Sequence, residues 1–149
     1  MIRSSILAGI HMPLLTLPFD PLTGPILKVA IAYPKSLHQP EGGEPPIKTI
    51  NMLIDSGASW TSISPGIAED LGLPETGLRS ITSVTQTVDV KEFLADMILP
   101  MGGSAPITDL RLVEFPMGDD SIAGLFGRDL LNQCLFQMNG PGKTFTLSY

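Results

Sequence analysis

The sequence predicts a mostly antiparallel β fold, a small closed β-barrel with two short helices. Apolar stretches of strand length recur along the chain, and turn residues separate them. The 15 glycines and 14 prolines are too few to indicate disorder but suit a chain with many turns. No repeat of solenoid length is found. With 149 residues, the chain is long enough for one domain with a hydrophobic core.

Residues 1–24 contain three prolines and no periodicity, so we expect an irregular N-terminal arm before a domain at 25–149. Within the domain, apolar runs and alternating patterns indicate strands, and clusters of Pro, Gly and Glu indicate loops. The expected elements are a strand at 25–33, a loop at 34–46, strands at 48–54 and 60–63, a helix at 64–71, a strand-like segment at 80–99, strands at 107–115 and 124–126, a helix at 128–134, and a hairpin of 135–138 and 144–149.

Local signals set the ends of several elements. Ser64 suits the N-cap of the first helix, with Pro65 at its first position, and the helix ends at Gly72. Asp129 lies in the first turn of the second helix, where a negative charge complements the helix dipole. The turn Asn139-Gly140-Pro141-Gly142 joins the two strands of the final hairpin.

The most informative motif is Asp55-Ser56-Gly57-Ala58-Ser59, which follows the apolar run Met52-Leu53-Ile54 directly. It places a carboxylate, a hydroxyl and a glycine in sequence where a buried strand ends, as the active site of an aspartic peptidase requires. Gly57 lets the backbone turn sharply and supply an N–H donor to the carboxylate. The alternative is that Asp55 only makes an Asx-turn, which is common at strand ends.

A second motif, Leu125-Phe126-Gly127-Arg128-Asp129-Leu130-Leu131, lies nearer the C-terminus. Together the two motifs resemble the retropepsin-like aspartic proteases, which include retroviral enzymes, ubiquitin-shuttle proteases and single-domain bacterial members. The bacterial members appear nearest, and the resemblance runs from about Lys48 to the C-terminus. It implies a retropepsin-like fold and aspartic endopeptidase activity, with Asp55 catalytic and with Ser56, Gly57 and Gly127 supporting the catalytic loop.

An aspartic peptidase activates water between two carboxylates that share one proton, because two like charges so close cannot both ionise. No second Asp-Ser/Thr-Gly motif is present: the segment 20–24 has the wrong spacing, and 119–121 lacks the glycine. We therefore expect a homodimer in which each chain supplies Asp55. Its interface should include the Asp55 turn, the helix from Arg128 and the strand at 144–149.

The resemblance also implies a flap, a hairpin over the substrate, at about 81–90. The flap of this chain has no glycine at its tip. Ser59 stands where the family usually has the acidic partner of Arg128, so Arg128 could instead bond backbone carbonyls or another carboxylate. Trp60 could be a core residue or a pocket wall. The expected substrate contacts are Ala58, Ser59, Trp60, Val84, Thr85, Gln86 and Phe126.

Composition limits the possible partners. The net charge of −6 argues against nucleic acid, which binds basic patches. Hydrophobic residues make up 43% and charged residues 16%, so apolar surface is available for a subunit interface. The single cysteine, Cys134, cannot form an intrachain disulfide, and we expect a buried, inert thiol. His11 and His38 have no second ligand nearby, so we expect neither metal nor cofactor.

The segment from Met1 to Leu17 resembles a signal peptide only in part, because His11 and Pro13 interrupt its apolar run. No run approaches the roughly 18 apolar residues that mark a membrane span, and we expect a cytoplasmic protein with no membrane contact.

The leading function is a homodimeric aspartic endopeptidase that binds an extended peptide or protein substrate. The alternative is a weak or inactive retropepsin-fold module for dimerisation or peptide binding. A third reading is a domain that releases itself from a precursor by self-cleavage. A cleft blocked by the flap or the N-terminal arm would favour the second.

Overall fold

The computed structural model describes the chain except residues 1, 8 and 9, so Met1 and Ala8 of the signal-peptide-like segment lie outside it. Its strands are β1 (Ile2–Leu7), β2 (Ile10–Pro18), β3 (Ile26–Ala32), β4 (Ile47–Ile54), β5 (Ser62–Ile63), β6 (Glu75–Thr82), β7 (Thr87–Ile98), β8 (Ile107–Glu114), β9 (Gly124–Phe126), β10 (Leu135–Asn139) and β11 (Thr144–Ser148). The α-helices are α1 (Ile67–Leu71) and α2 (Arg128–Leu131), and two single 3₁₀ turns lie between β3 and β4.

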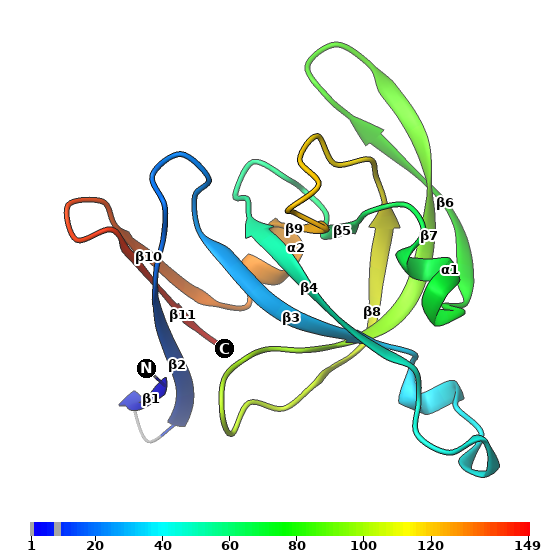
Figure 1. The fold of residues 1–149 in the computed structure, drawn as a ribbon, viewed down its shortest axis with the longest axis horizontal. Helices are drawn as coiled ribbons and strands as arrows, with labels where there is room; N and C mark the ends of the chain where they lie inside the picture. The colour runs from blue at the N-terminus through cyan, green and yellow to red at the C-terminus, as the bar shows by residue number, and fades with distance from the viewer. Residues whose placement is uncertain (1, 8–9) are drawn as a thin grey trace.

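Seven strands form one sheet in the order β3-β4-β9-β5-β8-β7-β6. A further pairing of β3 with β7, from Ala30↔Ile98 to Ala32↔Asp96, closes this sheet into a ring that leaves β6 outside (Figure 1). A second sheet, with the order β1-β2-β11-β10, lies beside the ring and holds both ends of the chain. The predicted mostly β fold with two short helices is confirmed, but the second sheet was not foreseen as a separate unit.

The expectation of an irregular N-terminal arm is wrong. Residues 10–18 form β2, which pairs with β11 from Leu14↔Ser148 to Pro18↔Thr144. Leu15 is buried in the core, and the carbonyl of Pro13 accepts a hydrogen bond from the Ser148 hydroxyl. The strand forms because β11 supplies backbone partners, and a partner so distant in sequence leaves no local periodicity to detect.

Strand β11 is hydrogen-bonded along both edges, to β2 on one side and to β10 on the other. Its Phe145 and Leu147 side chains are almost completely buried. The strand at 144–149 therefore has no free edge to offer to a second chain. The outer strands of this sheet are β1 and β10, and β10 carries the exposed side chains of Leu135 and Met138.

The interior of the ring forms the hydrophobic core. Side chains from β3, β4, β7, β8 and β9 fill it, and Leu27, Ile31, Met52, Met97, Leu112 and Phe126 are completely buried. Helix α1 begins after Gly66 rather than at Pro65, because Gly66 has a left-handed backbone (φ 95°) that a helix start at Pro65 would not allow. No helix in the described part of the chain is long and apolar enough to cross a lipid bilayer.

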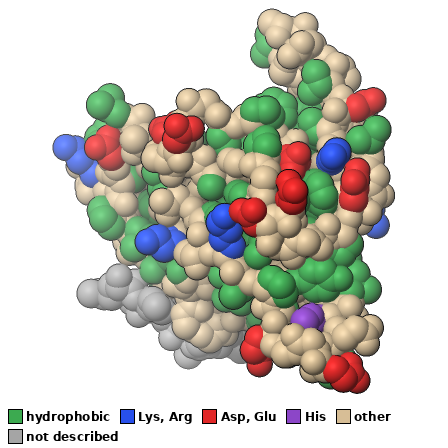
Figure 2. Space-filling model, turned by 45° about the vertical axis from the view of Figure 1, so that its right-hand side comes forward, with side chains coloured by type: hydrophobic (Ala, Val, Ile, Leu, Met, Phe, Trp, Pro, Cys, Tyr) green, Lys and Arg blue, Asp and Glu red, His purple; other side chains and the backbone are tan. Residues whose placement is uncertain are grey.

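The β6–β7 hairpin projects from the ring (Figure 1). Its first strand begins at Glu75, earlier than the pattern predicted, and its turn lies at residues 83–86. The projecting tip contains no charged side chain, as the space-filling view shows (Figure 2). The hairpin stands in the position where the family resemblance led us to expect a flap.

Candidate active site

Asp55 lies at the end of β4, where the chain leaves the ring sheet. Strand β4 runs parallel to β9, and the Asp55 N–H donates a hydrogen bond to the Phe126 carbonyl at 3.0 Å. The Asp55 Oδ1 atom accepts a hydrogen bond from the Gly57 N–H at 2.8 Å, and the Ala58 N–H donates to the Asp55 carbonyl at 3.2 Å. The carboxylate is half-buried at a tight turn whose backbone is fixed on both sides.

The same local contact occurs at two other aspartates. Asp20 Oδ1 accepts from the Leu22 N–H at 2.7 Å, and Asp119 Oδ1 accepts from the Ser121 N–H at 2.8 Å. The Asx-type hydrogen bond therefore does not by itself mark a catalytic carboxylate. Asp55 differs from both because it ends a core strand and lies beside the second motif.

Gly127 is required because the two motifs approach each other closely. A Cβ atom at this position would lie 2.6 Å from the carbonyl carbon of Trp60 and 3.0 Å from the carbonyl oxygen of Ala58. The Arg128 N–H donates to that Ala58 oxygen at 2.8 Å. The start of α2 thus packs directly against the Asp55 turn.

The Arg128 side chain extends along the same turn. Its Nη1 donates to the Ser56 carbonyl at 2.8 Å, and its Nη2 donates to the Ser59 hydroxyl at 2.9 Å. Of the two alternatives left open for Arg128, the backbone carbonyl is the one observed. Ser59 occupies the place of an acidic partner and still binds the guanidinium as a neutral acceptor.

Two further hydrogen bonds between the Asp55 turn and α2 involve Thr61, which was not predicted as a site residue. Its buried hydroxyl donates to Asp129 Oδ1 at 2.7 Å and accepts from the Gly127 N–H at 3.1 Å. Asp129 lies in the first turn of α2, where its charge complements the dipole, and its Oδ1 also accepts the Leu130 N–H at 3.0 Å. A threonine six residues after the aspartate gives no sequence signal of this role.

A cleft of about 260 Å³ lies between the Asp55 turn and the β6–β7 hairpin. The expected contacts Ala58, Ser59 and Trp60 line this cleft, and Asp55 itself does not. Trp60 is 38% exposed and forms a wall of the cleft rather than part of the core. The full lining is Gly57, Ala58, Ser59, Trp60, Ser62, Ile81, Thr82, Ser83, Val113, Phe115 and Leu125.

Four of the expected contacts do not line the cleft. Phe126 is completely buried, and its neighbour Leu125 faces the cleft instead, because consecutive side chains of a strand point to opposite faces. Val84, Thr85 and Gln86 lie at the exposed turn of the hairpin, beyond the residues that form the wall. The hairpin contributes Ile81, Thr82 and Ser83 in their place.

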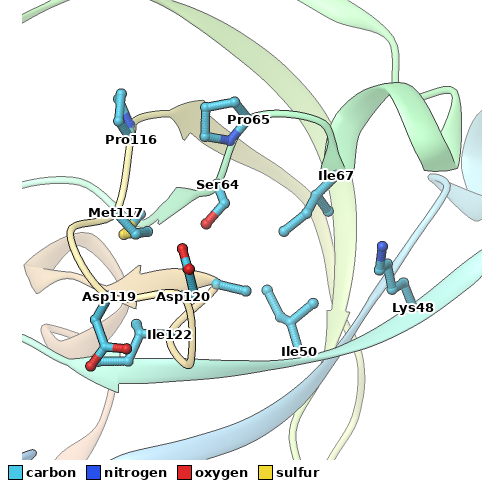
Figure 3. A pocket seen from close by; sticks show the side chains of 11 residues that line it. Lys48, Ile50, Ser64, Pro65, Ile67, Pro116, Met117, Asp119, Asp120 and Ile122 are labelled. Atoms are coloured by element: carbon cyan, nitrogen blue, oxygen red, sulfur yellow. The ribbon is translucent and has the colours of Figure 1, made fainter.

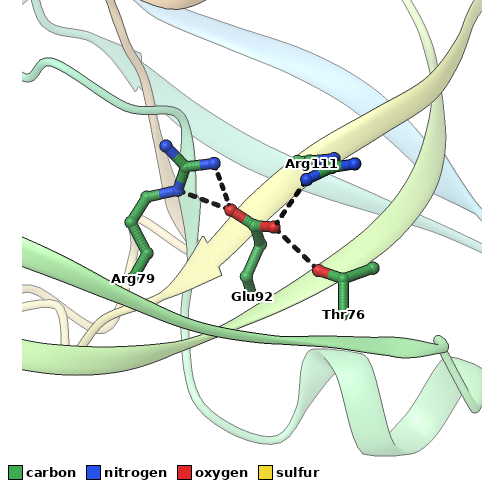
Figure 4. A network of polar contacts seen from close by, with 4 residues as sticks. All are labelled: Thr76, Arg79, Glu92 and Arg111. Carbon is green, nitrogen blue, oxygen red and sulfur yellow. Dashed lines mark hydrogen bonds and ion pairs between the residues drawn. The ribbon is translucent and has the colours of Figure 1, made fainter.

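The sequence also gave no sign of the buried carboxylate of Glu92, which lies at the base of the β6–β7 hairpin. Glu92 on β7 is 5% exposed, and it accepts hydrogen bonds from the Thr76 hydroxyl at 2.8 Å and from Arg79 Nε (Figure 4). Arg79 Nη2 and, at 3.5 Å, Arg111 Nη1 form ion pairs with it. Burial alone would raise the pKa of Glu92, but the Thr76 and Arg79 hydrogen bonds and the charges of Arg79 and Arg111 lower it overall.

A separate hollow of about 370 Å³ lies between β4, the start of α1 and the loop before β9 (Figure 3). Lys48, Ser64, Ile67, Met117 and Asp120 are among the residues that line it, and none belongs to the Asp55 turn. Within the described residues, no group of three or more His, Cys, Asp or Glu side chains is placed to hold a metal ion. The Asp55 cleft is therefore the candidate site.

A closed, mostly β fold in which an Asp-Ser-Gly turn packs against an apolar-apolar-Gly strand is that of a retropepsin-like aspartic protease. The chain belongs to the aspartyl protease family, whose model matches residues 42–130 and so includes the Asp55 motif and the second motif up to Leu130. Among solved structures, it is similar to the crystal structure of a retropepsin-like aspartic protease from Rickettsia conorii. That match has a TM-score of 0.60 at 12% identity and covers 100% of this chain and 94% of the other. A search of curated proteins gave no match.

Proposed function

We propose that this protein is an aspartic endopeptidase whose active site forms between two copies of the chain, with Asp55 supplied by each. Family membership supports the aspartic protease class. The observation that supports an active site shared between two chains is that one chain holds a single Asp-Ser-Gly turn, which is half of the site. One Asp-Ser-Gly turn is fixed at the end of β4, and the cleft beside it does not reach the Asp55 carboxylate.

A single chain does not supply the second carboxylate that the reaction needs. Among the described residues, the Asp55 carboxylate accepts a hydrogen bond from the Gly57 N–H, and no acidic side chain lines the cleft beside the turn. The related motifs at Asp20 and Asp119 belong to other turns, and neither lines the cleft. A two-fold axis beside Asp55 would bring two equivalent carboxylates together without any further residue.

The proposed chemistry follows from that pairing. One Asp55 carboxylate, as general base, removes a proton from the attacking water. The other, protonated, donates a hydrogen bond to the scissile carbonyl and stabilises its developing negative charge. The Gly57 N–H and the packing of Gly127 against the turn would hold each carboxylate in position during both steps.

The cleft is open in the way that a peptidase requires. Of the N-terminal strands, β1 pairs with β2 and β2 pairs with β11 in the second sheet, and no residue of either strand lines the cleft. The hairpin forms one wall of the cleft, and its tip projects outward (Figure 1). This arrangement favours a peptidase over an inactive binding module, for which a blocked cleft would be expected.

The test is cleavage of a peptide library by the purified protein at several acidic to neutral pH values. Asp55→Asn should abolish turnover while leaving the fold intact. Asp20→Asn is a matched control, because Asp20 makes the same contact with the N–H two residues later but lies in another turn, between β2 and β3. The wild type should show a bell-shaped rate profile with an optimum below neutrality, because the dyad must hold one proton. Full activity in purified Asp55→Asn would exclude the aspartic dyad.

A further inference from the structure

Arg79 lies on the cleft side of the β6–β7 hairpin. Residues two apart on a strand point to the same face, and Ile81 on that face lines the cleft. The guanidinium carbon of Arg79 lies 3.9 Å from the ring centroid of Trp60, which forms the opposite wall. Arg79 is not among the residues that line the cleft, but its guanidinium stacks on the Trp60 ring, which does line it, so Arg79 borders the cleft at the Trp60 end.

The carboxylate of Glu92 fixes the position of the Arg79 guanidinium. Arg79 donates through Nε and Nη2 to Glu92, which is itself held by the Thr76 hydroxyl at 2.8 Å (Figure 4). Within the described residues, Arg79 Nη1 makes no hydrogen bond, and the Arg79 side chain is 26% exposed to solvent. An arginine whose plane is set by a carboxylate still has N–H donors to offer to a second carboxylate.

The ion-pair network around Glu92 contains more positive than negative groups. Two guanidinium groups, Arg79 and Arg111, surround the single carboxylate of Glu92. The remaining side chains on the same face of the hairpin, at Ile81, Val88 and Val90, carry no charge. Within this network, positive groups outnumber negative ones by one, although the chain as a whole carries a net charge of −6.

We propose that Arg79 is a specificity-determining residue that selects an acidic side chain of an extended substrate at the Trp60 end of the cleft. This inference rests on the proposed function, in that it takes the cleft to bind a peptide in extended form. The acidic side chain would accept hydrogen bonds from the free N–H groups of Arg79 and lie beside the indole ring. Glu92 acts through Arg79, as a positioning residue that holds the guanidinium plane.

The test is a positional scan with neutral peptides that carry a single Glu or Gln at each position in turn. At one position, the wild type should cleave the Glu peptide about two- to fivefold more efficiently in kcat/KM, mainly through KM, as expected of a partly exposed ion pair. Arg79→Gln should reduce this ratio to about one. Arg111→Gln is the matched control: it also removes one positive charge beside Glu92, but it leaves the Arg79 N–H groups and their contact with Trp60 in place, so a preference for Glu should remain.

A wild-type preference that shrinks as ionic strength rises from about 0.05 to about 0.5 M would support the ion pair even if Arg79→Gln folded poorly. Equal cleavage of Glu and Gln peptides by the wild type at every position would overturn the inference and leave the proposed function standing. A preference that persists in folded Arg79→Gln would also overturn it.

Binding can be followed without cleavage, since Trp60 is the only tryptophan and its fluorescence reports the occupied cleft. Titrating Asp55→Asn with the same peptides should give the same Glu preference. If the wild type cleaved nothing, the proposed function would fail, and this titration would still decide the inference. Tighter binding of the Glu peptide would support it, and equal or absent binding would overturn it.

Discussion

Replacing Gly127 by alanine should damage both the fold and the catalytic turn. The Cβ would lie 2.6 Å from the Trp60 carbonyl carbon and 2.7 Å from its oxygen, and both are backbone atoms that cannot rotate away. Relieving the contact to 3.0 Å requires a backbone shift of about 0.4 Å. The φ of Gly127 is −91°, which alanine tolerates, so the expected cost is steric and on the order of 1–3 kcal/mol.

The same shift would move the turn that carries Asp55, and activity should fall by roughly tenfold if a displacement of about 1 Å costs about a hundredfold. Unfolding in urea and peptide cleavage would measure the two effects. Gly102→Ala is the control, because a Cβ there meets no atom within 4 Å and its φ is not positive. Unchanged stability and activity in Gly127→Ala would refute the close packing of the two motifs.

Three further perturbations have distinct signatures. Glu92→Gln should lower the free energy of unfolding by about 1–3 kcal/mol at pH 7. Because the pKa of Glu92 is lowered on folding, the stability that its charged form contributes should be complete above the ordinary pKa of 4.5 and fade as the pH falls below it. A difference in unfolding free energy between wild type and Glu92→Gln that grew with acidity, measured in urea, would contradict this. Burial raises the pKa of Cys134 to about 11, so iodoacetamide should alkylate the native thiol far more slowly than the unfolded one, and equal rates would exclude a shielded thiol. Amide exchange should be faster in residues 81–90 than in β4, and a shorter turn at 84–87 should impair peptide binding more than folding. Equally slow exchange would make the hairpin a core element and direct the search for a flap to the 34–46 loop.

The sequence predicted those parts of the fold that depend on local signals. The strand before Asp55, the strand at Gly124–Phe126, the final hairpin and both helices were placed within a few residues. Strand β2 was missed because 10–18 carries no clear periodicity, and one of its two partners, β11, lies more than a hundred residues away. The pairing of β3 with β7 likewise depends on tertiary contact and left no trace in local periodicity.

In the candidate site, too, the residues with local sequence signals were predicted, and those that depend on tertiary contacts were not. Asp55, Gly57 and Gly127 could be identified because the constraints on them are local, a tight turn and a close backbone approach. The cleft wall was predicted less well, since the assignment of Phe126 required knowing which face of a short strand points inward. Glu92 and Arg79 gave no signal, because their pairing brings together residues 13 apart on two strands of one hairpin.

The central claim is that each active site uses Asp55 from two chains, and mixing wild type with Asp55→Asn tests it most directly. After subunits exchange in an equal mixture, about one quarter of the dimers should hold two wild-type chains, so activity should fall to about half of that of the same amount of wild type alone. Sedimentation would establish that the mixed species are dimers. Activity that stays proportional to the amount of wild type at every ratio, with exchange shown to be complete, would contradict a shared active site.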